Sequence, residues 1–378
     1  MAPDAPERSY VGEVIAANLH RLRTARRMSL ATLAARADVA KATLANLEQA
    51  PGSRYVDGVG NLVWAFGPPP YRLAVLVHVD DVFDEATERG VTRRDGWLCG
   101  PGIGDNAIAV ATTVAVAERE LAGPGPLPVA VVFTVGEEGL GGLRGARHAC
   151  RELAPEAVLA LEGHGCDRVF TDAVGSLRVR FTVTGPGGHS WWDRGRPSAV
   201  HELTGLLHAM IASVPAPLTV NVGLVEGGSG VNAIAARASA TVEWRATDQA
   251  ALDRQEAALA GLRPAVAAGL RLSVERLDRR PAGSLPVTHP LVAAVLRARS
   301  SIGLPVTTAD GSTDANAALA AGIPAVALGC CQGEDMHAPT ERIRADSIAT
   351  GAKAGCVGTS WTCSPSIHTS RPSRSDSM

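Results

Sequence analysis

Hydrophobic and polar positions follow two distinct patterns along the chain. Between residues 53 and 171, short apolar runs (LAVLVHV, PVAVVFTV and AVLALEG) are separated by Ala-rich stretches of helical character such as NAIAVATTVAVAERELA. Apolar strands that alternate with helices are typical of an α/β domain with a mostly parallel sheet and flanking helices. The same pattern returns at residues 284–352, so we expect these two parts to form one domain.

Residues 172–283, between these parts, follow the second pattern. SLRVRFTVTG alternates strictly, with Leu177 and Val179 on one face and Arg178 and Arg180 on the other. LTVNVGLVEGG and ASATVEWRA continue the alternation. A period of two predicts an antiparallel sheet with one solvated face. The sequence therefore predicts an α+β domain inserted into the α/β domain.

The two ends of the chain fit neither pattern. Residues 11–52 have a helical pattern and carry more cationic than anionic side chains. Residues 353–378 are Ser-rich and aperiodic, and we expect them to form a disordered tail.

Composition narrows the class of protein. A chain of 378 residues with 46% hydrophobic and 20% charged residues is typical of a soluble globular protein with more than one domain. Its net charge of −2 favours no class of partner. Seven cysteines, without a Cys-x-x-Cys pair, indicate reduced thiols. The chain starts without an apolar signal and contains no run as long as a membrane span, so we expect a cytoplasmic protein.

Two adjacent carboxylates, Glu137 and Glu138, follow the strand-like run VVFTV and Gly136. Neighbouring anions at the end of a buried strand repel each other and resist desolvation. A solvated loop would explain them simply. However, the carboxyl ends of strands in α/β sheets are where ligands bind, and a bound cation would relieve the repulsion.

Five further positions offer side chains for such a cation. His78 and Asp80 end the run LAVLVHVD, and Asp105 lies in a Gly-rich turn before a helix. Glu162 ends a third strand-like run, and His337 follows a fourth, IPAVALG. Each alone could be a hydrogen-bonded core histidine, a helix N-cap or a solvated carboxylate. Together, carboxylates and imidazoles without a thiolate suit zinc, cobalt or manganese.

These residues stand in blocks that resemble the co-catalytic zinc metallopeptidase and aminoacylase family. This family includes peptidase T, carboxypeptidase G, acetylornithine deacetylase and succinyl-diaminopimelate desuccinylase. The blocks are HVD (78–80), GPGIGDN (100–106), GEEG (136–139), GPGGHSW (185–191), GGSGVNAIA (227–235), STDAN (312–316) and MHAPTE (336–341). Their order and spacing are specific, and the chain is most similar to the peptidase T-like branch.

The resemblance implies a dinuclear centre of two divalent metal ions, usually zinc. Asp105 would bridge the two ions. His78 and Glu162 would complete one site, and Glu138 and His337 the other. An α/β fold of the dinuclear zinc peptidase type is implied for residues 53–171 and 284–352.

The same resemblance implies roles for five other side chains. Glu137 would be the general base, and Asp80 would accept a hydrogen bond from the neighbouring metal-binding histidine. His189 would donate to the developing oxyanion, often from the other subunit. Asn232 and Arg245 would bind the substrate backbone or carboxylate, although the pattern alone favours a solvated strand position for Arg245.

The implied reaction is hydrolysis of an amide bond in a small peptide or N-acyl amino acid. The inserted domain, residues 172–283, would act as a lid and form a homodimer. The chain departs from the family at Asp81, where Thr is usual, and at Cys330 and Cys331, where Gly is favoured. Family members usually have some fifty residues of helix and strand before the equivalent of residues 56–64, and we expect that segment to be missing.

In its place, residues 19–49 resemble the helix-turn-helix of Cro/lambda-repressor-type (XRE) regulators. The second helix would present Lys41, Thr43 and Asn46 to DNA. An amphipathic helical hairpin is the alternative, and a gene fusion or sequencing artefact would also explain the arrangement.

Two functions thus stay open. A zinc hydrolase is favoured because all five ligands and the base are present. A DNA-binding regulator, whose weak or inactive hydrolase domain senses a small molecule, is favoured by the missing segment.

Overall fold

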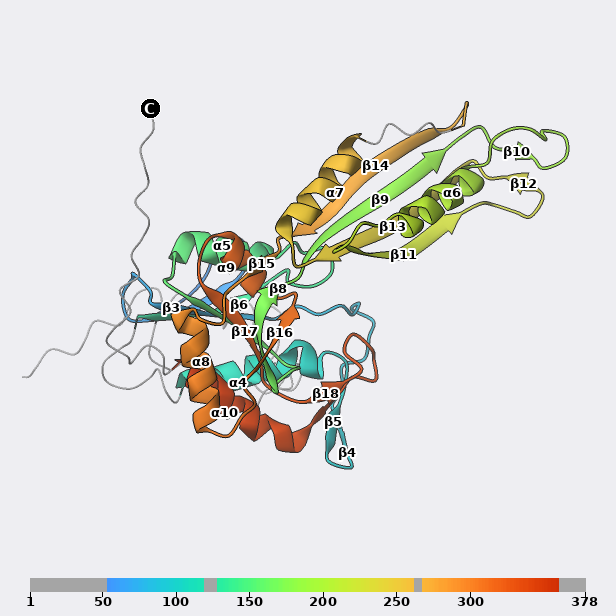
Figure 1. Cartoon of the computed structure of the whole chain (residues 1–378). Helices are drawn as coiled ribbons and strands as arrows, with labels where there is room; N and C mark the ends of the chain where they lie inside the picture. Colours follow the sequence, from blue (N-terminus) through green and yellow to red (C-terminus); the bar gives the residue numbers. More distant parts are fainter. Residues whose placement is uncertain (1–52, 119–127, 262–266, 360–378) are drawn as a thin grey trace, which may run out of the picture.

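The computed structural model describes residues 53–118, 128–261 and 267–359 of the chain (Figure 1). The segment predicted to be a helix-turn-helix, residues 11–52, lies outside the described residues, and so do Lys41, Thr43 and Asn46.

A nine-stranded mixed sheet forms the body of the chain, in the order β1-β2-β6-β3-β7-β17-β8-β15, with β16 also paired to β8. Its strands are β1 (Ser53–Val56), β2 (Leu62–Phe66), β3 (Leu73–His78), β6 (Val129–Thr134), β7 (Val158–Glu162), β8 (Arg168–Ala173), β15 (Gly283–Ser284), β16 (Thr307–Gly311) and β17 (Ala325–Gly329). The central strands β6, β3, β7 and β17 run parallel to one another.

The expectation of a mostly parallel sheet was wrong away from this centre. β1 pairs with β2, β2 with β6, and β8 with both β17 and β15 in antiparallel fashion. A short turn joins β1 to β2, and such a turn permits only antiparallel pairing, because a parallel pair needs a long crossover.

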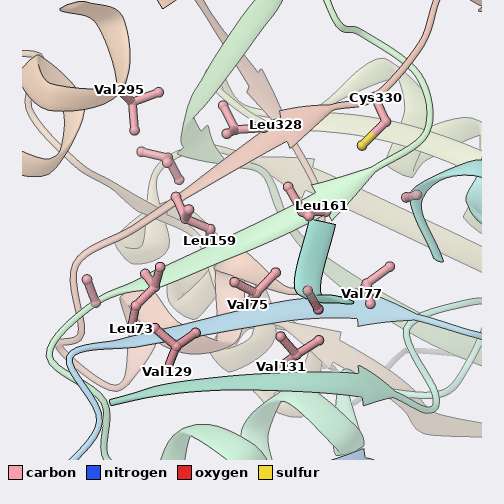
Figure 2. Close-up of a cluster of buried hydrophobic side chains, with 14 of the residues drawn as sticks. Leu73, Val75, Val77, Val129, Val131, Leu159, Leu161, Val295, Leu328 and Cys330 are labelled. Carbon is pink, nitrogen blue, oxygen red and sulfur yellow. The ribbon is translucent and has the colours of Figure 1, made fainter. Parts of the chain in front are cut away.

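Both faces of the central strands are buried, as their near-continuous apolar runs require. On one face, alternate residues of β3 such as Leu73, Val75 and Val77 pack with α4 (Ile108–Val116) and α8 (Pro290–Ser301), as Figure 2 shows in part. On the other face, Ala74 and Leu76 pack with α5 (Arg144–Leu153) and α9 (Ala315–Ala320). The sheet is thus a fixed platform between two helical layers.

The last helix, α10 (Ile348–Thr359), packs beside α4 and α8. It extends beyond residue 353, where the sequence predicted the start of a disordered tail. That boundary was wrong because the helix continues through an Ala- and Gly-rich stretch with little amphipathic pattern. No helix in the described part of the chain is both long and apolar enough for a membrane crossing.

Residues 174–282, here called the inserted segment, leave the large sheet after β8 and return at β15 (Figure 1). Its four antiparallel strands lie in the order β11-β13-β9-β14. They are β9 (Gly175–Thr184), β11 (Thr219–Gly227), β13 (Arg237–Ala246) and β14 (Arg271–Arg280). α6 (Ala199–Ala212) and α7 (Gln249–Gly261) cover the face formed by Leu177, Val179, Phe181 and Val183, which are all buried.

Two smaller sheets complete the fold. β10 (Gly188–His189) and β12 (Ala233–Ile234) pair at the end of the inserted segment farthest from the large sheet (Figure 1). β18 (Gly333–Glu334), β19 (Arg342–Arg344), β5 (Trp97–Cys99) and β4 (Thr92–Arg94) form the other sheet. β19 of this second sheet lies against the turn Ile103–Ala107.

Candidate metal centre

His78, Asp105 and Glu162 form the first of two groups that share a carboxylate. His78 is the last residue of β3 and Glu162 the last of β7, and these parallel neighbours end at the same edge of the sheet. The Nε2 atom of His78 lies 3.1 Å from Oδ1 of Asp105 and 3.3 Å from Oε2 of Glu162.

Asp105, Glu138 and His337 form the second group. The Nε2 atom of His337 lies 3.0 Å from Oδ2 of Asp105 and 3.3 Å from Oε1 of Glu138. Asp105 therefore directs one carboxylate oxygen to each histidine. Within each group the potential ligand atoms lie within 4.8 Å of one another. The structure thus brings the five predicted metal ligands together, with Asp105 between the two groups.

Negative charge exceeds positive charge among the five candidate ligands at this edge of the sheet. Burial alone would raise the pKa of Asp105, but the adjacent imidazoles of His337 and His78 hold it well below its ordinary value. Hydrogen bonds with Asp105 and Glu138 raise the pKa of His337 to about 10. Burial raises the pKa of Glu162. Three carboxylates face two imidazoles, and the buried Oδ1 of Asp105 has no hydrogen bond of good geometry among the described residues. A set of oxygen and imidazole donors with excess negative charge fits a divalent cation.

Glu137, the predicted base, is buried beside this centre. Arg280 Nη1 donates to its Oε1 atom at 2.8 Å, and Arg280 Nη2 donates to its backbone carbonyl. Burial raises the pKa of Glu137 to about 8, although Arg280 and His78 act in the opposite sense. Glu137 also lies close enough to His78 and Glu138 for their polar atoms to form a third group of potential ligands.

Asp80 differs from its predicted role. Nδ1 of His78 lies 3.0 Å from the backbone carbonyl of Asp80, so the side chain of Asp80 is not the acceptor. Instead, the Asp80 carboxylate accepts the backbone N–H groups of Gly136, Glu137 and Glu138 at 2.9 to 3.3 Å. The residue still fixes the His78 tautomer, through its main chain, and its side chain shapes the loop of the adjacent carboxylates.

Of the departures from the family pattern, Asp81 has a side-chain partner, whereas Cys330 and Cys331 bond to their surroundings through their backbones. Asp81 forms a bidentate pair with Arg89, at 2.7 and 3.2 Å, which occupies both of its carboxylate oxygens. The charge of Asp81 is therefore neutralised by Arg89. Cys330 and Cys331 are buried, and their backbone N–H groups donate to the carbonyls of Glu162 and Gly163. They hold the strand end that carries Glu162.

His189 and Asn232 lie at the far end of the inserted segment, and both are exposed. The backbone carbonyl of Asn232 accepts from Ser190, which ties the two loops together. Arg245 lies on β13, and its guanidinium donates to Glu243 at 2.8 and 3.1 Å. Within the described ranges, no hydrogen bond or ion pair connects these three predicted residues directly to the five metal-ligand candidates.

Sequence reasoning missed several buried partners of the centre. Glu341 is fully buried, accepts the backbone N–H of Asp105 at 2.9 Å and lies 2.6 Å from Nε2 of His164. Asp314, also buried, accepts from Thr134 Oγ1 at 2.5 Å. Both carboxylates stand in quoted blocks, MHAPTE and STDAN, and that position was the available signal. Arg280 lies in none of the blocks.

Solved structures with a similar fold include several peptidases. A tripeptidase from Staphylococcus aureus aligns with a TM-score of 0.69 at 20% identity, over 82% of this chain and 88% of that one. An aminopeptidase from Bacillus cereus aligns with a TM-score of 0.64 at 20% identity, over 82% and 89%. At these identities the likeness shows the fold.

Sequence comparison adds a family and curated relatives. A probable carboxypeptidase from Paracoccidioides brasiliensis is 25% identical over 209 residues, which is 48% of this chain and 47% of that protein. The chain thus spans about half the length of the curated relatives it matches. The profile of Peptidase family M20/M25/M40 matches residues 74–356, which include all five ligand candidates and Glu137. The chain belongs to Peptidase family M20/M25/M40.

Proposed function

We propose that this chain hydrolyses an amide bond in a small peptide or an N-acyl amino acid at a dinuclear metal centre, most readily of zinc, with cobalt or manganese as alternatives. The observation that carries the proposal is the pair of three-residue ligand groups that share Asp105, with Glu137 buried beside them. The similar solved structures named as a tripeptidase and an aminopeptidase, and the probable carboxypeptidase, support a peptide as substrate.

His78, Asp105 and Glu162 would hold one ion, and Asp105, Glu138 and His337 the other. Bound ions would supply the charge that acidifies a water molecule and polarises the scissile carbonyl. Glu137 would accept the proton of the attacking water and pass it to the leaving amine.

His189 would donate to the developing oxyanion. Its Nδ1 atom accepts the backbone N–H groups of Trp191 and Trp192 at 3.2 and 3.3 Å. Since an acceptor nitrogen carries no hydrogen, the proton of the neutral ring resides on Nε2. The ring therefore offers one N–H donor, which is what a developing oxyanion needs.

His189 is carried at the end of the inserted segment remote from the large sheet, which favours delivery from a second subunit. β11 is an edge strand of the inserted sheet, with Leu224 and Val225 both more than 60% exposed. An exposed apolar edge strand is suited to pairing with another copy. We therefore include a homodimer through the inserted segment in the proposal, with Asn232 and Arg245 as contacts to the substrate backbone or carboxylate.

The test is a hydrolysis panel of dipeptides, tripeptides and N-acyl amino acids, with metal-loaded and with chelator-treated protein. Glu137→Gln should lower kcat by about 10²- to 10⁴-fold and keep its metal, because the amide oxygen still accepts from Arg280. Glu138→Gln is the matched control, because the neighbouring carboxylate is a ligand and its loss should lower metal content. No hydrolysis of any panel member by the metal-loaded protein would contradict the proposal, and so would wild-type turnover in Glu137→Gln.

A further inference from the structure

Arg280 contacts both the side chain and the backbone of Glu137, although it belongs to a different part of the fold. It is the last residue of β14, at the point where the inserted segment returns to the large sheet. Both side chains are 5% exposed, so the contact is shielded from water. A guanidinium is a rigid planar fork, and one that grips two groups of the same residue restricts both the side-chain rotamer and the local backbone.

A second arginine of the inserted segment contacts the same loop, residues 136–139. Arg178, on β9, donates to the backbone carbonyl of Gly139, two residues beyond Glu137. Its guanidinium is held in turn by Glu243 on β13, at 2.7 Å, and by Asp278 on β14, at 3.4 Å. Arg178 is therefore fixed to three strands of the inserted sheet while it holds the loop.

The strands that carry these arginines are neighbours in the inserted sheet. β14 pairs with β9, with Arg280 opposite Ser176 and Asp278 opposite Arg178. β9 leads on to β10 and His189, which lie in the separate small sheet beyond the other end of the inserted sheet (Figure 1). One end of the sheet thus holds the loop of the base, and the other end carries the predicted oxyanion donor.

We propose that Arg280 is a positioning residue for Glu137, and that with Arg178 it ties the loop at residues 136–139 to the inserted sheet. The orientation of the Glu137 carboxylate then depends on the position of the inserted sheet relative to that loop. This inference rests on the proposed role of Glu137 as general base.

A merely structural ion pair would act differently. Breaking a buried pair destabilises the whole protein because it leaves an uncompensated charge. A positioning residue acts on the rate through one group, and displacing a catalytic group by about 1 Å can cost on the order of 100-fold. Substrate affinity and metal binding, which depend on other residues, would stay close to wild type.

The experiment compares Arg280→Met, Arg280→Lys and Arg279→Met in the metal-loaded full-length protein. Arg279→Met is the control, since Arg279 is the adjacent residue but pairs with Asp253 and Glu256 on α7. The readouts are kcat and KM for the best panel substrate, metal content, and hydrogen exchange of peptides that cover residues 136–143.

Arg280→Met should lower kcat by about 100-fold with little change in KM or metal content, and should speed exchange in residues 136–143. Arg280→Lys should recover part of the rate, because it keeps the charge but not the fork, and it provides a folded variant if the Met protein does not fold. Arg279→Met should match wild type in every readout.

Two results would overturn the inference. One is a kcat within about threefold of wild type in both Arg280 variants, with the panel otherwise confirming Glu137 as base. The other is unchanged exchange of residues 136–143 in Arg280→Lys and in any folded Arg280→Met, which decides the structural tie whether or not the protein is a hydrolase. If wild type and Glu137→Gln have equal activity, the proposed function fails instead, and the exchange readout still reports on the tie.

Discussion

Asp105→Ala should weaken both proposed metal positions at once, because Asp105 is the one candidate ligand common to the group with His78 and Glu162 and the group with Glu138 and His337. The substitution reduces each group from three candidate ligands to two. Loss of an outer partner of a ligand already costs about 10- to 100-fold in metal affinity, so loss of the ligand itself should cost at least ~100-fold at each position. His337→Ala touches one group and should leave the other intact.

These affinities translate into stability. At a free metal concentration ~100 times the dissociation constant, binding stabilises the folded protein by about 2.7 kcal/mol per site, or about 5.4 kcal/mol for two independent sites. A 100-fold weaker site contributes only about 0.4 kcal/mol at the same concentration. The metal-induced stabilisation should therefore be about 5.4 kcal/mol for wild type, about 3 kcal/mol for His337→Ala and below about 1 kcal/mol for Asp105→Ala.

The assay is denaturant unfolding of each protein with metal and with chelator, alongside elemental analysis of the bound metal. Only the difference between the two conditions is compared, because loss of Asp105 also alters the metal-free protein. Asp81→Ala is the matched control: Asp81 lies near the centre but pairs with Arg89, so its metal-induced stabilisation should equal that of wild type. Two ions per chain and a wild-type difference in Asp105→Ala would refute the shared position of Asp105.

Three other predictions concern His189 as the oxyanion donor, the proton that His337 releases when metal binds, and the packing of the hydrophobic core. His189→Ala should lower kcat by about 10²- to 10³-fold and leave metal content intact, and mixed dimers with Glu137→Gln should regain activity if the donor crosses between subunits; a near-normal kcat would leave His189 a structural loop residue. Hydrogen bonds raise the pKa of His337 to about 10 in the metal-free protein, so this group stabilises that protein fully below about pH 6.5 and loses the effect as pH rises through about 10. Metal must displace that proton, so calorimetry in buffers of different ionisation enthalpy should show proton release at pH 7 and tighter binding at higher pH, and proton-neutral binding would contradict the assignment of His337 as ligand. Leu159→Ala, in the buried core, should destabilise the protein by about 2 to 5 kcal/mol in urea unfolding, whereas Leu140→Ala, at 56% exposure, should change stability by less than about 0.5 kcal/mol.

The features predicted best from the sequence are those that depend on short-range patterns of apolar residues. His78 and Glu162 end continuous apolar runs, and parallel strands bring such ends to one edge, so their meeting followed from the pattern. The placement of Asp105 between two histidines could not be read from its Gly-rich turn, which also suits an N-cap, and came from resemblance to a family.

Other features depend on contacts that no local pattern encodes. Arg280 meets Glu137 across 143 positions of sequence, and its alternating strand predicts only which face it occupies. The role of Asp80 was misjudged because a residue type does not reveal whether its main chain or its side chain is the acceptor. The antiparallel edges of the large sheet escaped prediction for a related reason, since apolar runs indicate burial and carry no strand direction.

The ligand candidates span the chain from His78 to His337, on both sides of the inserted segment. A ribosome adds about 5 to 20 residues per second, so roughly ten seconds to a minute separate the emergence of the first histidine from that of the last. During this interval the nascent chain carries three carboxylates and one imidazole without their final partner. Under the proposed function, the position that uses His337 can therefore fill only after nearly the whole described chain has been translated, whereas the three residues of the other position, His78, Asp105 and Glu162, all emerge before the inserted segment.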